Sequence, residues 1–357
     1  MFQMKRHVEF SLLFIIVSIL ITINEFNTLQ SIKSDGELFQ NNFVQCPLPV
    51  ACGQSQETFD LKCIQTSTGR IASNSSYAVV SMLLDIEINP LVGMQLDLRF
   101  ELYVEQLRVL GFLIRSRGNL TCSVDMFLMV KSRLPLKYVK RLHGVGWNFV
   151  VIDEIESPRN VSEVLKGHRF LHMFTKLHIF NMTAYDAVLY LDADTIVTGS
   201  ISDMFDVYLP EMIRRDVYIG WSVDLGNRGN DFYGRNNAGV LLVRPSSAVL
   251  QDMMHSMNQI SFNAGMSEQG FLNAYFQPVT ELNIPAETYN CMPANRCFVE
   301  SKNVSIAHFT IIKPESILWK LRCWYEGILD MCNAWSQYKR ELDTVVDTSR
   351  SRVLTHT

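Results

Sequence analysis

From about residue 76 onward, short apolar runs alternate with longer segments of helical period, and few folds are compatible with this alternation. Strands that alternate with helices in this way form βαβ units around a parallel sheet. The sequence therefore predicts an α/β fold with a mainly parallel central sheet. The best-defined strand is 187–191 (Ala-Val-Leu-Tyr-Leu); the other candidate strands are 77–84, 125–130 and 148–152, and the candidate helices are 94–110, 136–142 and 169–180.

Length and composition favour one principal folded domain. The chain has 357 residues, of which 48% are hydrophobic, so it can bury a sizeable core and is not disordered throughout. The 32 basic and 36 acidic side chains nearly balance, and no dense Lys/Arg block occurs beyond the first residues. Nucleic acid is therefore not expected as a partner.

The N-terminus has the pattern of a signal-anchor. Lys5 and Arg6 precede an apolar stretch at 8–23 that is shorter than the ~20 residues of a full bilayer span. Because no small-x-small cleavage site follows, we interpret 1–7 as a cytosolic tail and 8–23 as an uncleaved membrane anchor, with a cleaved signal as the alternative. This predicts a single-pass type II protein of the Golgi or endoplasmic reticulum membrane whose folded domain is luminal.

The segments beside the main domain are polar. Residues 24–70 are rich in Asn, Gln, Ser and Thr, which is typical of a stem that holds a domain away from a membrane. The main domain is predicted at 71–335. Residues 336–357 form a polar C-terminal tail, either an exposed helix or a frayed end.

Two features indicate an oxidising compartment. Eight cysteines lack the paired spacing of zinc sites, so disulfides are expected, with Cys291–Cys297 and Cys323–Cys332 as the two local pairs; buried free thiols are the alternative. The chain also has five Asn-x-Ser/Thr sequons, which predict a glycosylated surface. Their asparagines are Asn74, Asn119, Asn160, Asn181 and Asn303.

An acidic pair follows the best-defined strand directly. Asp192 and Asp194 flank Ala193 at the carboxyl end of 187–191, the edge at which open α/β sheets bind ligands. Two carboxylates spaced in this way can reach one divalent ion, and hard oxygen ligands suit Mg²⁺ or Mn²⁺ together with substrate phosphates. A helix cap or turn is the alternative reading of the same residues.

Five separate stretches resemble, in the same order, the glycogenin-like family 8 glycosyltransferases, and the resemblance covers roughly residues 77 to 325. One of them precedes the acidic pair, one contains it, and the other three follow it along the chain. They are 174–178 (Phe-Thr-Lys-Leu-His), 189–195 (Leu-Tyr-Leu-Asp-Ala-Asp-Thr), 236–246 (Asn-Asn-Ala-Gly-Val-Leu-Leu-Val-Arg-Pro-Ser), 267–273 (Ser-Glu-Gln-Gly-Phe-Leu-Asn) and 308–314 (His-Phe-Thr-Ile-Ile-Lys-Pro).

The resemblance implies a Rossmann-like, GT-A type fold and a retaining transfer of sugar from a UDP-sugar donor to a glycan or glycoprotein acceptor. The implied metal is Mn²⁺, with Mg²⁺ as the alternative, because a histidine among oxygen ligands favours Mn²⁺. Asp192, Asp194 and His308 are the implied metal ligands. The implied cofactor-binding residues are Asp192, Ala193, Asp194, Asn237, Ala238, Gly239, His308 and Lys313, and the implied catalytic residues are Lys176, Asp224, Glu268 and Gln269.

The chain departs from the family pattern in three places, one of which is the segment 263–267, longer than its family counterpart. Glu268 stands where the family has Asp, and Ile311 replaces a glycine whose backbone approaches the phosphates. These departures raise the alternative of a catalytically degenerate luminal protein that binds glycans or a partner enzyme. A metal phosphohydrolase is a second alternative, but the sequence lacks the further acidic and histidine clusters that a two-metal site requires.

Overall fold

The computed structural model describes residues 64–65, 76–84, 93–120, 124–132, 134–166, 169–224, 235–293, 297–300, 303–310, 313–314, 319–325 and 327–354. The chain divides into two compact units, Met1–Gln45 and Cys46–Thr357, and all described residues belong to the second. The predicted tail at 1–7 and anchor at 8–23 lie outside the described residues. Within the described part, no helix combines the length and the apolar character that a membrane span needs.

Eight strands of the described chain form one sheet with the spatial order β1-β4-β3-β2-β5-β8-β7-β9. Neighbours from β1 to β5 pair in parallel, β8 runs antiparallel to both β5 and β7, and β9 is parallel to β7. The prediction of an α/β fold with a mainly parallel, mixed sheet is confirmed. The strands are β1 (Ile64–Gln65), β2 (Tyr77–Leu83), β3 (Val124–Val130), β4 (Asn148–Val151), β5 (Ala187–Leu191), β7 (Ile219–Val223), β8 (Asn236–Val243) and β9 (Glu281–Asn283).

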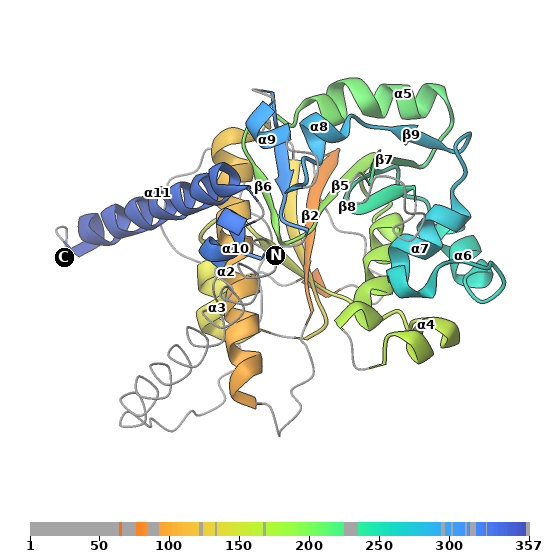
Figure 1. The fold of residues 1–357 in the computed structure, drawn as a ribbon, viewed down its shortest axis with the longest axis horizontal. Helices are drawn as coiled ribbons and strands as arrows, with labels where there is room; N and C mark the ends of the chain where they lie inside the picture. The colour runs from red at the N-terminus through yellow and green to blue at the C-terminus, as the bar shows by residue number, and fades with distance from the viewer. Residues whose placement is uncertain are drawn as a thin grey trace, which may run out of the picture. The chain divides into compact units, whose positions relative to one another are not determined.

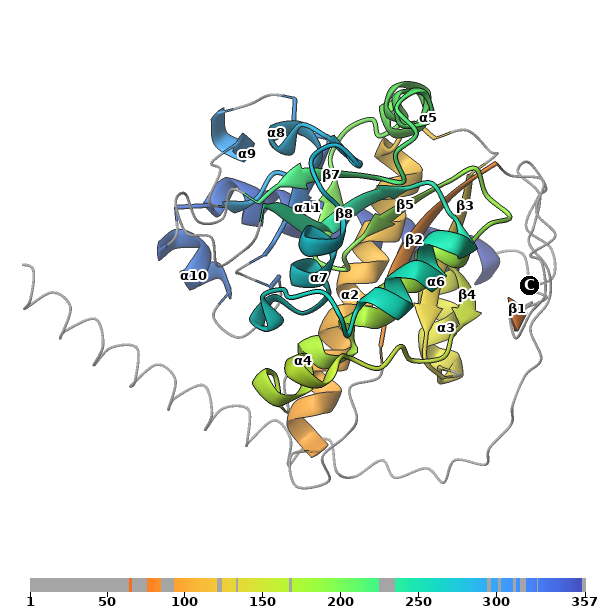
Figure 2. The ribbon, with the colours of Figure 1, turned by 90° about the vertical axis from the view of Figure 1, so that its right-hand side faces the viewer.

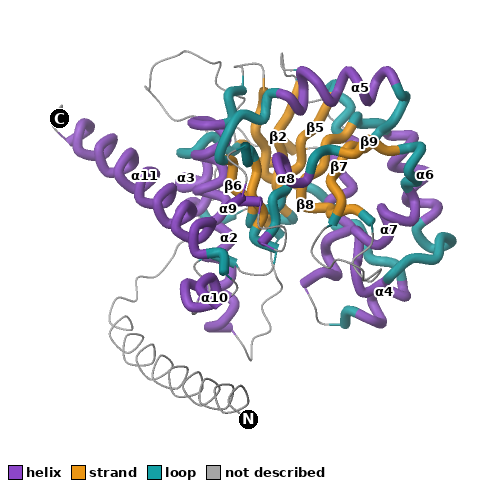
Figure 3. Tube along the Cα trace, turned by 45° about the horizontal axis from the view of Figure 1, so that its top comes forward, coloured by secondary structure: helices purple, strands orange, loops and turns teal. Residues whose placement is uncertain are grey.

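Helices lie on both sides of this sheet (Figures 1 and 2), with α2 on one side and α6 and α7 on the other. Figure 3 shows the strands between the two sets of helices. The helices are α2 (Gly93–Arg117), α3 (Leu136–His143), α4 (Arg159–Val164), η1 (Arg169–Asn181), η2 (Met204–Tyr208), α5 (Leu209–Arg214), α6 (Ser247–Ser256), η4 (Ala264–Met266), α7 (Ser267–Tyr275), α8 (Ala286–Tyr289), α9 (Cys297–Glu300), α10 (Trp319–Tyr325) and α11 (Leu329–Leu354).

The strands divide their side chains between two apolar cores. In β5, Leu189 and Leu191 face the core that contains Leu107 of α2. Val188 and Tyr190 face the core that contains Phe174 and Leu177 of η1. Successive strand residues point to opposite faces, so a strand that is buried on both faces reads as a continuous apolar run. This is why 187–191 is so clearly visible in the sequence.

A short ribbon beside the main sheet brings a distant part of the chain to the end of β5. Strand β6 (Thr195–Val197) pairs antiparallel with β10 (Ile306–His308), and the register sets His308 opposite Thr195. Because Thr195 directly follows Asp194, this pairing delivers His308 to the acidic turn.

Both predicted disulfides are present. Cys291 bonds to Cys297 with a Cα–Cα distance of 5.8 Å, and Cys323 bonds to Cys332 at 6.4 Å. The second bond joins α10 to α11. These contacts confirm the prediction of local pairs and agree with an oxidising compartment.

Three features differ from the sequence prediction. Strand β1 (Ile64–Gln65) pairs with β4, so the sheet begins inside the segment assigned to the stem at 24–70. The predicted boundary between 335 and 336 falls within α11, where Leu342 is buried against the core. The predicted helix at 169–180 is observed as the 3-10 helix η1.

Candidate active site

A hydrogen-bonded turn at the carboxyl end of β5 positions the acidic pair. The backbone N–H of Asp192 donates to the carbonyl of Gly239 at 2.8 Å, and the N–H and hydroxyl of Thr195 donate to the carbonyl of Asp192 at 3.0 and 2.8 Å. The turn places Asp192 and Asp194 on one side of the backbone, with Asp194 buried. Both carboxylates can therefore reach one point, as predicted, and the backbone forms a turn to bring them there.

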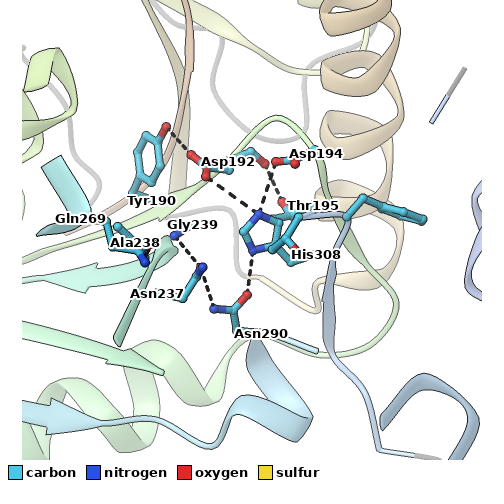
Figure 4. A network of polar contacts seen from close by, with 12 residues as sticks. Tyr190, Asp192, Asp194, Thr195, Asn237, Ala238, Gly239, Gln269, Asn290 and His308 are labelled. Carbon is cyan, nitrogen blue, oxygen red and sulfur yellow. Dashed lines mark hydrogen bonds and ion pairs between the residues drawn. The ribbon is translucent and has the colours of Figure 1, made fainter. Parts of the chain in front are cut away.

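The carboxylates of Asp192 and Asp194 and the imidazole of His308 converge (Figure 4). His308 Nε2 lies 3.4 Å from Asp194 Oδ1 and 3.9 Å from Asp192 Oδ2, and one ligand atom of each residue lies within 4.8 Å of the others. Two ligands that share an ion at about 2.1 Å are at most about 4.2 Å apart, so both measured distances suit a common Mg²⁺-sized ion. Two carboxylates and an imidazole also suit Mn²⁺.

His308 is buried, and burial lowers its pKa even though Asp192 acts in the opposite direction. The imidazole is therefore neutral at pH 7, the form that ligates metals. Gly239 leaves the space that the ring occupies, because a Cβ at this position would lie 2.1 Å from His308 Cε1. Any larger residue at 239 would displace the ring from the carboxylates.

Lys176 lies beneath the acidic turn with a side chain only 1% exposed. Its Nζ is 2.8 Å from Glu268 Oε1 and 3.3 Å from Asp192 Oδ1, and it donates to the carbonyl of Ala238 at 2.9 Å. Burial alone would lower the pKa of Lys176, but the two carboxylates outweigh burial and raise it. Lys176 is thus a buried cation that supports Asp192 and Glu268.

Tyr190 also contacts the Asp192 carboxylate. Its hydroxyl donates to Asp192 Oδ1 at 2.9 Å, and its ring centroid is 4.8 Å from the Lys176 ammonium. Burial opposes ionisation of Asp192, but Lys176, His308 and this hydrogen bond together lower the pKa of the carboxyl group. Asp192 is consequently an anion over the physiological pH range.

The predicted sugar-binding residues form one polar cluster beside the metal ligands. Asp224 Oδ2 accepts hydrogen bonds from Asn237 Nδ2 and Gln269 Nε2, each at 3.1 Å. Gln269 Oε1 in turn accepts from the backbone N–H of Ala238 at 3.0 Å. Strands β7 and β8 and helix α7 thereby bring together residues that are 45 positions apart in sequence.

A cleft of about 120 Å³ opens beside the acidic turn. The acidic turn and Lys313 border it on one side, and Lys313 pairs with Asp194. The remaining lining is largely apolar or aromatic and includes Met82, Leu83, Leu84, Tyr103, Phe170 and Met173. A cleft that is charged at one end and largely apolar or aromatic elsewhere suits a ligand with both a charged part and a ring-shaped part.

The formal charges of the site also favour a divalent cation. The carboxylates of Asp192, Asp194 and Glu268 contact Lys176 or Lys313, and the carboxylate of Asp224 lies in the adjoining polar cluster. Counted over these described side chains alone, four carboxylates and two lysines give two net negative charges, which one divalent ion would balance. A buried excess of charge is costly without such compensation.

The structure thus brings every predicted site residue into one region, while Ile311 lies outside the described residues. Two contributors were not predicted. Tyr190 belongs to an apolar strand and looked like a core residue, and Asn290 precedes a disulfide cysteine without any motif of its own. Only the tertiary contacts reveal them.

Comparison with known proteins gives a consistent result. Residues 107–314, more than half of the chain, match the model of glycosyl transferase family 8. The chain is 30% identical to inositol phosphorylceramide glucuronosyltransferase 1 of Arabidopsis thaliana, over 66% of this chain and 43% of that protein. It is 29% identical to glycogenin-1 of Mus musculus, over 48% of this chain and 50% of that protein.

The chain therefore spans about half, or less, of the length of these two relatives. Among solved structures, it is similar to galactosyltransferase LgtC in complex with donor and acceptor sugar analogues, with a TM-score of 0.47 and 17% identity over 74% of this chain and 95% of that chain. The predicted resemblance is confirmed by the family match: the chain belongs to glycosyl transferase family 8, with the mainly parallel GT-A type fold of that family.

Proposed function

We propose that this chain is a metal-dependent, retaining glycosyltransferase that moves a sugar, and specifically glucuronic acid, from a UDP-sugar to a glycan or glycoprotein acceptor in the secretory pathway. The observation that carries the proposal is the convergence of Asp192, Asp194 and His308 at one end of a cleft, next to the Asp224–Asn237–Gln269 cluster. The name of the plant relative, a glucuronosyltransferase, supports the choice of sugar.

Asp192, Asp194 and His308 would hold the metal, which supplies charge neutralisation to the leaving diphosphate. Lys313, at the edge of the cleft, would lie beside the same phosphates. Lys176 acts one layer deeper, because it holds the Asp192 carboxylate in place instead of facing the cleft. The side chains around Asp224 would accept hydrogen bonds from the sugar hydroxyls and donate hydrogen bonds to them.

No side chain in this arrangement needs to form a covalent intermediate. The acceptor hydroxyl would attack on the face from which the diphosphate departs: its oxygen would form the new bond to the sugar, the bond from the sugar to the diphosphate would break, and the hydroxyl proton would pass to the departing diphosphate. Attack on that face retains the anomeric configuration. The protein then contributes fixed charges and orientation, and prearranged electrostatics of this kind supply a large share of many enzymes' rate enhancement. The apolar side of the cleft, with Tyr103 and Phe170, would pack against the uracil base.

The luminal location is supported by the surface and by the disulfides. The asparagines of the four described sequons, at Asn119, Asn160, Asn181 and Asn303, are exposed, so an oligosaccharide could be attached without disturbing the core. Both disulfides in the described chain require an oxidising compartment to persist. Golgi or endoplasmic reticulum membrane anchoring through 8–23 belongs to the same proposal.

A panel of UDP-sugars tests the choice of donor. In the presence of Mn²⁺ we expect hydrolysis of UDP-glucuronate with a kcat/KM at least about tenfold above that of UDP-glucose and UDP-galactose, because a site that bonds a sugar's polar groups discriminates against analogues that lack them. Each donor should be assayed with and without chelator as the matched control. Faster turnover of UDP-glucose or UDP-galactose than of UDP-glucuronate would contradict the choice of glucuronic acid. The chelator arm would still test whether the reaction depends on a metal.

A further inference from the structure

Asn290 occupies a buried position beside His308. It follows helix α8, is fully buried, and precedes Cys291, whose backbone is joined to β10. The N–H of Cys291 donates to the carbonyl of Ile306 at 2.9 Å, and the N–H of His308 donates to the carbonyl of Cys291 at 2.8 Å. These two bonds and the Cys291–Cys297 disulfide fix the backbone that presents the Asn290 side chain to the imidazole.

The orientation of the Asn290 amide follows from a backbone group. The N–H of Gly239, which can only donate, lies 2.9 Å from one side-chain atom of Asn237, so that atom is Oδ1. Asn290 approaches the same oxygen at 3.1 Å and must therefore present Nδ2 to it. The other amide atom of Asn290, Oδ1, then faces His308 Nδ1 at 2.9 Å.

This chain of contacts decides which nitrogen of His308 carries the proton (Figure 4). An amide oxygen accepts a hydrogen bond, so Nδ1 must be the protonated nitrogen of the neutral ring. Nε2 is left with its lone pair, directed at Asp192 and Asp194 at 3.9 and 3.4 Å. Three electron-pair donors facing one another repel unless a cation lies between them.

We propose that Asn290 is a positioning residue for the metal site: it holds His308 as the Nδ1–H tautomer, with Nε2 free to ligate, and Asn237 and the Gly239 amide determine its orientation. The inference deepens the proposed function and rests on it for the metal. Partners of this kind fix the tautomer and direction of metal-ligating histidines, and their loss typically costs about 10- to 100-fold in metal affinity.

The tautomer can be measured in the metal-free protein, without any assay of activity. Nitrogen-15 labelling of histidine in the full chain should show a protonated Nδ1 and an unprotonated Nε2 for His308, whose signals are identified by their absence from a His308→Gln variant. In Asn290→Leu we expect the Nε2–H form to appear. A dominant Nε2–H form in the unsubstituted protein would overturn the inference.

Metal affinity provides the second readout. Asn290→Leu should raise the Mn²⁺ dissociation constant by about 10- to 100-fold, measured by calorimetry or by the electron paramagnetic resonance of free Mn²⁺. Tyr289→Phe is the matched control, because it removes the 2.7 Å bond from the neighbouring Tyr289 hydroxyl to Asp203, away from the metal ligands. We expect that control to change the constant less than about twofold, since the hydrogen bond that it removes involves neither Asn290 nor a metal ligand.

A double-mutant cycle separates positioning from general loss of structure. In a His308→Ala background, Asn290→Leu should have no further effect on Mn²⁺ affinity, because the residue through which it acts is gone. The same loss in both backgrounds would contradict the inference. Asn290→Asp keeps an oxygen opposite Nδ1 and should retain affinity better than Asn290→Leu. If Asn290→Leu does not fold, the tautomer of His308 in the unsubstituted chain decides the inference.

The two claims can fail separately. Failure of the unsubstituted chain to bind Mn²⁺ would refute the metal-dependent function, while the histidine tautomer would still decide the role of Asn290. Normal Mn²⁺ binding by both the unsubstituted chain and a folded Asn290→Leu variant would refute the positioning role and leave the proposed function intact.

Discussion

We expect Asp194→Asn to abolish donor hydrolysis in Mn²⁺, with a loss of at least about 1,000-fold, while the protein remains folded. The substitution removes an anionic ligand that lies 3.4 Å from His308 Nε2 and is paired with Lys313. Metal ions contribute several kcal/mol of charge stabilisation, and each 1.36 kcal/mol corresponds to about tenfold in rate. The rate of UDP release from the donor, measured beside a thermal melt, checks both parts of the expectation.

Asp206→Asn is the matched control for that substitution, because Asp206 is exposed on η2 and belongs to no part of the site. It should leave hydrolysis unchanged. Equal turnover of the Asp194→Asn variant and the unsubstituted chain would refute the assignment of Asp194 as a metal ligand.

Lys176→Met should lower the free energy of unfolding by about 3–5 kcal/mol, the range found when one partner of a buried ion pair is removed. Lys176 is almost fully buried, and its loss leaves the carboxylates of Asp192 and Glu268 without the cation between them. Urea denaturation at pH 7 measures the change. Addition of Glu268→Gln should recover part of the loss, because one of the two uncompensated anions is then neutral.

A surface lysine provides the comparison for this experiment. Lys339 pairs with Asp343 one turn along α11 at 3.2 Å, with both side chains partly exposed. Lys339→Met should change the free energy of unfolding by less than about 1 kcal/mol, as solvent screens exposed pairs. A similarly small effect for Lys176→Met would show that the buried cluster is not stabilised by its central cation.

Local patterns in the sequence predicted much of the site. The apolar strand at 187–191 ends at Asp192, and both features lie in one short stretch, so the acidic turn was visible without tertiary information. The disulfide pairs were predicted for the same reason, since their cysteines are separated by 6 and 9 positions. The family resemblance then placed Asn237, Gln269 and His308 around the turn.

Features that depend on long-range pairing were not predicted. Nothing in the polar segment at 24–70 indicates that Ile64 and Gln65 add to the edge of the sheet at β4. The contact of Asn290 with His308 requires the register of Cys291 against Ala307, which no periodicity encodes. Leu342 is buried within a largely polar sequence because α11 packs against α2, so composition alone suggested a tail.

The most direct test of the account is a calorimetric titration of the full chain with uridine diphosphate, in Mn²⁺ and again in chelator. We predict clear binding of uridine diphosphate with Mn²⁺ and an affinity at least about tenfold lower in chelator. Without the metal ion, the carboxylates of Asp192 and Asp194 would face the diphosphate with no cation between the like charges. Absence of heat in Mn²⁺, or the same affinity in chelator, would contradict the account and favour a scaffold that keeps the fold without the chemistry.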